Sequence, residues 1–238
     1  MKTTWRWTLS AGLVLASGLT GLGETAKADS SETSPAITIH VRNYASVAPK
    51  TLAEAEQEAT GIFRNAGVGT RWADDVLTVE NDQANPANHP AYSLADIQLS
   101  FLSREMSDRL GFPKNVMGLV PGTDAHVAYV FESQVNTLFS SALNALCHGR
   151  LDRQVSRSVI LGHAIAHELG HLLLDLKGHT TQGIMRAEWG LKDLWDAAHR
   201  ILVFSPQQAE VLRADVRRRN ARLETFNAVE LGSPALAR

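Results

Sequence analysis

The segment GHAIAHELGHLLLDLKGHTTQGIM, residues 162–185, contains four of the nine histidines of this 238-residue chain. From about Val155 to Leu174 the pattern is that of a helix that is apolar on nearly every side. Such a helix is typical of the middle of a domain, covered on both flanks. Histidine and glutamate are costly to bury without partners. The polar side chains of this helix therefore need a compensating interaction.

The spacing of the histidines suggests what that interaction is. His167 and His171 lie four residues apart, on one helix face, with Glu168 beside the first. Side chains at this spacing are close enough to hold one zinc ion, which binds imidazole nitrogen at about 2.0–2.1 Å. In this HExxH pattern the glutamate is placed to take a proton from water at the metal. His163 is about 12 Å of helix away from His171, so we expect an ordinary core or supporting histidine there.

A catalytic zinc site needs a third protein ligand and keeps a fourth position open. Gly178 can adopt the left-handed conformation that ends a helix, and His179 follows it directly. His179 is therefore the predicted third ligand. A carboxylate further along the chain, Glu188, is the alternative.

The chain resembles the zincin metallopeptidases, and within them the metzincins. The resemblance rests on HELGH at 167–171, on the histidine after a glycine, and on GIM at 183–185. Against the metzincin pattern HExxHxxGxxH, Leu174 stands in the place of the glycine and His179 comes two residues late. If the third ligand were Glu188, the site would be of the gluzincin type.

The resemblance implies an α+β fold: a twisted mixed sheet with an edge strand over a central active-site helix, followed by a C-terminal helix. It implies a Zn²⁺ site in which Met185 packs beneath the ligands without binding the metal. The implied activity is that of an endopeptidase, in which Glu168 assists the attack of water on a peptide or protein substrate. The substrate would lie along an edge strand, for which we expect HVAYVF at 126–131. Residues 69–93 and 186–204 are expected to line the specificity pocket.

A second interpretation is an inactive relative, a metal-containing binding protein in which Glu168 has no catalytic role. Structural zinc sites usually have four protein ligands, often cysteines. The chain has one cysteine, Cys147, which we expect to be a small buried hydrophobic residue rather than a nucleophile. The composition therefore favours the peptidase.

The start of the chain has the pattern of a secretory signal peptide. Lys2 and Arg6 precede an apolar run, residues 9–22, and an A-x-A cleavage pattern ends at Ala28. We expect residues 1–28 to be removed and residues 29–238 to form one catalytic domain, secreted or periplasmic. Removal of three basic residues and Glu24 changes the formal net charge from −2 to −4. That charge does not indicate a nucleic-acid partner, and we expect a monomer without a membrane anchor.

The remaining elements follow from periodicity and turn signals. A strand at 36–44, a helix at 51–67 and a strand from 68 to 72 predict a β-α-β opening, with Thr51 and Glu54 as a capping box. Further strands are predicted at 96–102 and 125–135, and a short helical piece follows 103. A long C-terminal helix is predicted to start with Ser205 as its cap and Pro206 as its first residue.

Overall fold

A computed structural model describes residues 34–74, 95–122, 126–149, 155–174 and 179–232, with side chains up to residue 225. The predicted signal peptide, most of the 69–93 segment and Gly178 lie outside these ranges. Within them the chain forms five strands and six helices. The content is mixed α and β, in agreement with the predicted α+β class.

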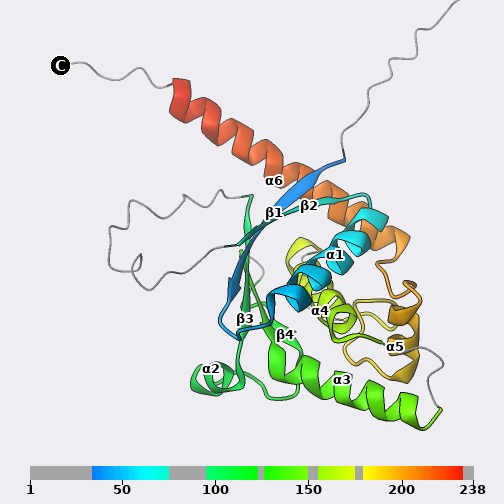
Figure 1. The fold of residues 1–238 in the computed structure, drawn as a ribbon. Coiled ribbons are helices and arrows are strands. Elements are labelled where there is room, and N and C mark those ends of the chain that lie inside the picture. Colours follow the sequence, from blue (N-terminus) through cyan, green and yellow to red (C-terminus); the bar gives the residue numbers. More distant parts are fainter. Residues whose placement is uncertain (1–33, 75–94, 123–125, 150–154, 175–178, 233–238) are drawn as a thin grey trace, which may run out of the picture. The chain divides into compact units, whose positions relative to one another are not determined.

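The strands form one mixed sheet with the order β2-β1-β3-β5-β4 (Figure 1). The first four in this order are parallel to one another, and β4 is antiparallel to β5. The predicted β-α-β opening is confirmed, because β1 and β2 pair in parallel and one helix lies between them in the sequence. The strands are β1 (Ala36–Asn43), β2 (Gly69–Asp74), β3 (Ile97–Leu102), β4 (Gly118–Leu119) and β5 (Val127–Phe131).

The predicted edge strand is wrong. β5, which contains most of HVAYVF, pairs with β3 on one side and with β4 on the other. The edge on this side of the sheet is β4, where Gly118 pairs with Val130 and Leu119 with Tyr129. A two-residue strand inside a segment rich in glycine and proline has no alternating pattern, so periodicity could not find it.

The helices are α1 (Pro49–Asn65), α2 (Arg104–Arg109), α3 (Glu132–Cys147), α4 (Arg157–Leu173), α5 (Leu191–Ala198) and α6 (Pro206–Gly232). The predicted capping box of the first helix is wrong, because α1 already begins at Pro49 and Ala48 provides no side-chain cap. The cap of the last helix is confirmed. Ser205 Oγ accepts a hydrogen bond from Gln208 N at 3.2 Å, and the Gln208 side chain accepts one from Ser205 N at 2.8 Å.

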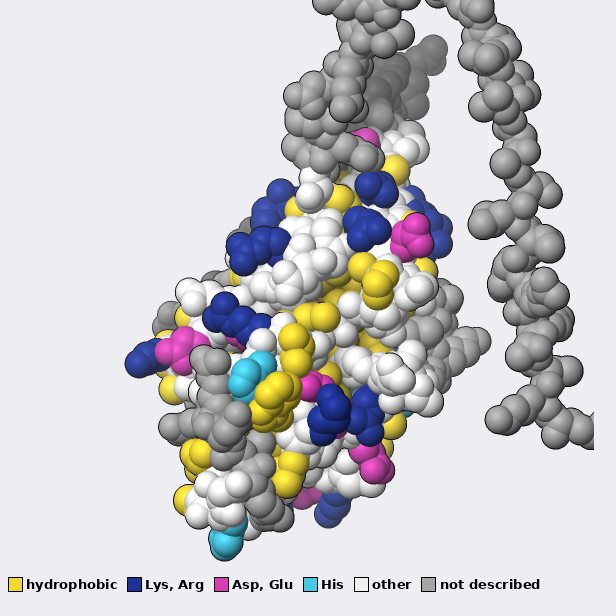
Figure 2. Space-filling model, turned by 90° about the vertical axis from the view of Figure 1, so that its right-hand side faces the viewer, with side chains coloured by type: hydrophobic (Ala, Val, Ile, Leu, Met, Phe, Trp, Pro, Cys, Tyr) yellow, Lys and Arg dark blue, Asp and Glu magenta, His cyan; other side chains and the backbone are white. Residues whose placement is uncertain are grey.

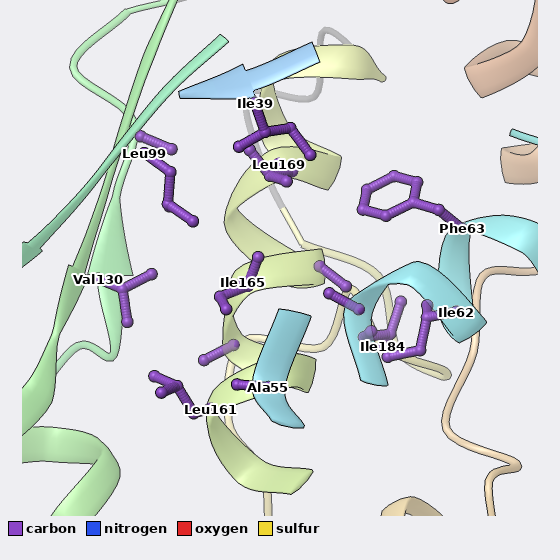
Figure 3. Packing of buried hydrophobic residues seen from close by; sticks show 14 of the residues in the cluster. Ile39, Ala55, Ile62, Phe63, Leu99, Val130, Leu161, Ile165, Leu169 and Ile184 are labelled. Carbon is purple, nitrogen blue, oxygen red and sulfur yellow. The ribbon is translucent and has the colours of Figure 1, made fainter. Parts of the chain in front are cut away.

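The core is formed by the sheet together with helices α4 and α1. Figure 3 shows α4 between sheet residues, such as Leu99 and Val130, and residues of α1, such as Ile62 and Phe63. Fourteen of the seventeen residues of α4 are buried. This confirms the prediction of a helix covered on both flanks, and it places the HELGH residues on a helix that is buried over most of its length.

The pattern missed two helices. The predicted strand at 125–135 ends at Phe131, and α3 starts at Glu132 without an intervening loop. Cys147 lies at the end of α3 and is exposed, so its predicted burial is wrong. The short helix α5 was not predicted either.

Helix α6 contains the basic stretch RADVRRRNAR at 213–222. This part of the helix has one buried face, at Leu212 and Val216, while Arg217, Arg218 and Arg222 are exposed. On the face drawn in Figure 2, basic side chains lie among acidic and uncharged ones. Among the described residues, no helix combines the length and the apolar character that crossing a bilayer requires.

Candidate metal centre

Helix α4 carries three of the predicted site residues. It begins after Ser156, whose Oγ accepts a hydrogen bond from Val159 N at 3.1 Å. It ends at Leu173, and its C-cap Leu174 still has helical backbone angles. His167 and Glu168 are buried and His171 is half-buried, so the first two are held by packing on several sides.

The three predicted histidines come together. His171 Nε2 lies 3.1 Å from His167 Nε2 and 3.3 Å from His179 Nε2. The ligand atoms of all three lie within 4.8 Å of one another. His179 is exposed and His167 is buried, so the cluster runs from the core to the surface. A third ring therefore reaches the pair on α4 in spite of its late position in the sequence.

The segment after His179 orients the innermost histidine of the cluster. The Nδ1 of His167 donates to the carbonyl oxygen of Ile184, at 2.7 Å. Because the carbonyl can only accept, the proton of the neutral ring sits on Nδ1 and the lone pair of Nε2 faces the other two histidines. A backbone carbonyl bound to the far nitrogen of a ligating histidine is the usual support of a metal ligand.

Met185 lies directly after that carbonyl and is fully buried. If Gly170 had a Cβ, that atom would lie 2.6 Å from Met185 Sδ. The thioether therefore packs against α4 at a position that has no side chain. Met185 O also accepts a hydrogen bond from Thr180 N at 2.8 Å. The turn at 183–185 is thereby linked both to α4 and to the residue next to His179.

Two of the three nitrogen pairs have the spacing expected at a tetrahedral metal ion. Two nitrogens bound at about 2.0–2.1 Å to a tetrahedral ion lie about 3.3–3.4 Å apart. The distances of 3.1 and 3.3 Å from His171 Nε2 are close to this edge length, and the ligand atoms of His167 and His179 lie within 4.8 Å of each other. Three imidazole nitrogens with one remaining corner are a typical donor set for catalytic zinc. His167, His171 and His179 could therefore hold such an ion.

The protonation state of His167 suits a ligand. Burial lowers its pKa to about 4, the Ile184 carbonyl opposes this shift, and the neighbouring rings of His171 and His179 add to it. His167 is therefore neutral at pH 7, so no proton has to leave it before a metal binds.

Glu168 is a buried carboxyl group beside this cluster, 5% exposed. Burial raises its pKa to about 8. Its side chain lies against Gly118 of the edge strand, where a Cβ would overlap both the Glu168 side chain and the Tyr129 carbonyl oxygen. Gly118, which sequence reasoning missed, therefore makes the space that Glu168 occupies.

The cluster opens into a cleft of about 730 Å³. The three histidines and Glu168 line one side, residues on and around β4 line another, and α3 contributes a third. Of the segments predicted to line a specificity pocket, 186–204 contributes Ala187, Glu188 and Trp189. Strand β2 lies at the opposite end of the sheet, so its residues 69–74 do not take part.

Trp189 is a second residue that the sequence did not single out. Its ring lies edge-on to His167, with centroids 5.8 Å apart, and edge-on to His163 at 6.2 Å. The segment that carries it is braced by Arg186, whose Nη1 donates to both carboxylate oxygens of the buried Asp193, at 2.7 and 2.8 Å. Gly190 N donates to the same carboxylate at 2.8 Å.

His163 and the alternative ligand Glu188 stand apart from the cluster. His163 is fully buried, and its Nδ1 donates to Val159 O at 2.8 Å. This agrees with its predicted role as a core histidine. Glu188 is exposed on the wall of the cleft, and among the described residues the group that could hold a metal contains His179 and not Glu188.

A scan against protein-family models found no match for this chain, and a search of curated proteins found no similar sequence. The geometry of the site is therefore the basis on which a function can be proposed.

Proposed function

We propose that the chain is a secreted, metzincin-like zinc endopeptidase, made as a precursor with a signal peptide at 1–28. The observation that carries this proposal is the convergence of three imidazoles beside a buried carboxyl group at the wall of an open cleft. A purely structural zinc site would usually have four protein ligands and needs no such carboxyl group or cleft.

Each residue of the site would have a separate role. His167, His171 and His179 would hold the zinc ion, and Ile184 O would keep the His167 ring in orientation. When bound, zinc supplies Lewis-acid chemistry, because it polarises a carbonyl oxygen and lowers the pKa of water toward 7. Met185 supports the site from the core without binding the ion.

Glu168 is the proton carrier. Its raised pKa belongs to the chain alone, and a nearby divalent cation would favour the charged carboxylate and lower that pKa. The carboxylate takes a proton from the attacking water as the oxygen–carbon bond forms. It then gives the proton to the amide nitrogen as the carbon–nitrogen bond breaks. The products are a carboxylic acid and an amine.

The edge strand β4 offers a place for an extended substrate. It is paired on one side only, with β5, and the side chain of Glu168 lies against its Gly118. A peptide can add to such an edge through backbone hydrogen bonds. We therefore propose that residues around 117–120 bind the substrate backbone, in place of the strand at 126–131.

The test is the Glu168→Gln variant. Glutamine keeps the shape of glutamate but cannot take up the proton, so peptide cleavage should fall by about 10²- to 10⁴-fold while bound zinc is retained. Zinc is measured by elemental analysis, and cleavage with a broad peptide library. Glu188→Gln serves as the comparison and should also retain its zinc.

Parental rates of cleavage by Glu168→Gln would contradict the catalytic role. A parent protein that holds zinc but cleaves no peptide would favour a metal-containing binding protein. Loss of zinc in Glu188→Gln would favour the gluzincin type of site.

A further inference from the structure

A second pocket, of about 500 Å³, lies between α1, the first half of α4 and the segment that follows α5. It shares no described lining residue with the cleft at the metal centre, and the proposed function does not use it. Apart from His163, its ionisable lining residues are two acids and two bases, Glu54, Glu58, Arg64 and Arg200. Neither sign of charge dominates, so the lining suits neither a simple anion nor a simple cation.

Glu58 is a half-buried acid on the α1 side of this pocket. Its aliphatic stem packs against α4 where Gly162 has no side chain, since a Cβ there would lie 2.6 Å from Glu58 Cβ. Burial raises the pKa of Glu58, and the nearby Arg200 opposes this shift. The carboxyl group is therefore partly removed from water, and a positively charged hydrogen-bond donor would stabilise its anion.

Arg200 is the base that acts on this acid across the pocket. Its backbone φ is 59°, in the left-handed region that favours glycine, and its N–H donates to Ala197 O at 3.0 Å. Among the described residues, neither Arg200 nor Glu58 has an ion-pair partner. The two opposite charges therefore interact across a space and are not in contact.

The rest of the lining is polar with a small apolar part. His163 lines the pocket and is fully buried. Because its Nδ1 donates to Val159 O, the Nε2 of the neutral ring is an acceptor, and the Leu202 carbonyl that also acts on this ring can only accept. No described residue donates to that Nε2. Val159 and Val203 supply apolar surface, so the pocket suits a small polar molecule with an aliphatic part.

We propose that this pocket binds a small zwitterion, an α-amino acid or a dipeptide, with its ammonium group at Glu58 and its carboxylate at Arg200. Such a ligand would give each of the two unpaired side chains a charge-assisted hydrogen bond. An ion with a single charge would pair with one of them and leave the other without a partner. The inference goes beyond the proposed function, because binding in this pocket requires neither the metal nor catalysis.

Two variants each remove one of the two charges. Glycine is favoured at a φ of 59°, so Arg200→Gly should melt at the parental temperature or above it while ligand binding is lost. Glu58→Gln keeps the shape of the other side chain. Glu210→Gln is its matched control, at an exposed position of α6 outside the pocket. His179→Ala distinguishes this pocket from binding of an amino acid at the proposed zinc site.

The experiment titrates the zinc-loaded protein with leucine, glycylleucine, N-acetylleucine and leucinamide, and follows binding by calorimetry. Leucine or glycylleucine should bind, and the preferred one identifies the ligand as an amino acid or a dipeptide. N-acetylleucine and leucinamide each lack one charge and should bind at least about tenfold more weakly, since a hydrogen bond to a charged group contributes at least this factor. Arg200→Gly and Glu58→Gln should weaken binding of the zwitterion by a similar factor. Glu210→Gln and His179→Ala should leave it unchanged.

Four results would overturn the inference. They are no saturable binding of leucine or glycylleucine, equal binding of the blocked forms, parental affinity in folded Arg200→Gly, and loss of binding in His179→Ala. Thermal melting checks that each variant is folded, and Arg200→Gly with the blocked ligands decides the matter even if Glu58→Gln does not fold. Failure of the proposed function is a separate result, because it is measured by peptide cleavage and not by binding in this pocket.

Discussion

At the scale of single residues, the candidate site depends on side chains whose protonation is set by burial. His167 and His163 are both buried on α4, and burial lowers the pKa of each to about 4. Glu168 is shifted in the direction that also favours its neutral form. In the absence of a metal, these three buried side chains therefore favour their uncharged forms at neutral pH. This is how an apolar helix tolerates them.

The buried His163 makes the stability of the metal-free protein depend on pH. Its pKa is lowered in the folded state, so between pH 6.5 and about 4 the unfolded chain takes up a proton that the folded chain does not. Stability is therefore lost as the pH falls through this range, by up to about 1.4 kcal/mol per pH unit for one group.

Urea unfolding of the parent and of His163→Gln between pH 4.5 and 6.5 measures this effect. The variant should show a smaller slope of unfolding free energy against pH, whatever its absolute stability. Equal slopes in the two proteins would contradict the lowered pKa of His163 in the folded state.

The HExxH residues and the third histidine could be predicted because their arrangement is local. A helix brings His167 and His171 together by its own geometry, and His179 follows soon after the helix. Gly118 and Trp189 reach the site through tertiary contacts, and nothing in their local sequence announces them. The same holds for Ile184, which acts through its backbone oxygen.

At the scale of elements, the fold holds α4 in place by close packing against α1. A Cβ on Gly162 of α4 would lie 2.6 Å from Glu58 Cβ and 2.7 Å from Ala55 O, both in α1. The helices approach each other so closely because this position has no side chain. The proposed metal ligands His167 and His171 follow five and nine residues later on the same helix.

Gly162→Ala should therefore lower the free energy of unfolding by about 1–3 kcal/mol, the usual cost of overpacking. Gly61→Ala in α1 is the matched control, since nothing lies within 4 Å of a Cβ there. It should be neutral or stabilising by up to about 1 kcal/mol, because alanine favours a helix. Denaturant unfolding compares the two, and equal effects would mean that the contact of α1 with α4 is not tight.

Most long elements were predictable, and the misses have physical causes. α3 follows β5 without a loop, so the alternating pattern continued into a helix. The spacing of Val135, Leu138, Phe139 and Ala142 was a helical signal that could have corrected this. The edge strand β4 has only two residues, and its place in the sheet follows from its partner rather than from its own sequence.

At the scale of the whole described chain, helix α6 is hydrogen-bonded to the C-cap residue of α1 and to the first residue of β1. Arg213 of α6 donates to Ala66 O at 2.8 Å, and Asn220 donates to Ala36 O at 3.1 Å. Leu212 and Val216 are fully buried. The three histidines proposed as ligands lie on α4 and on the segment that follows it, so they come together only when these parts are folded. Metal binding should therefore stabilise the whole fold.

Removal of the metal by a chelator should lower the melting temperature. A ligand present at about 1,000 times its dissociation constant stabilises the folded state by about 4 kcal/mol. For a domain of this size each kcal/mol corresponds to about 2–4 °C. His179→Ala should lose most of the zinc-dependent shift in thermal melting, and Glu188→Ala should keep it. The reverse pattern would assign the third ligand to Glu188.

The most direct test of the central claim is X-ray absorption at the zinc edge on the purified zinc-loaded protein. Three imidazole nitrogens and one further light atom are expected at about 2.0–2.1 Å from the metal, and His179→Ala should reduce the imidazoles to two. A spectrum with two imidazoles in the parent, with sulfur or four protein ligands around the metal, or with no change in His179→Ala would contradict a site built from His167, His171 and His179.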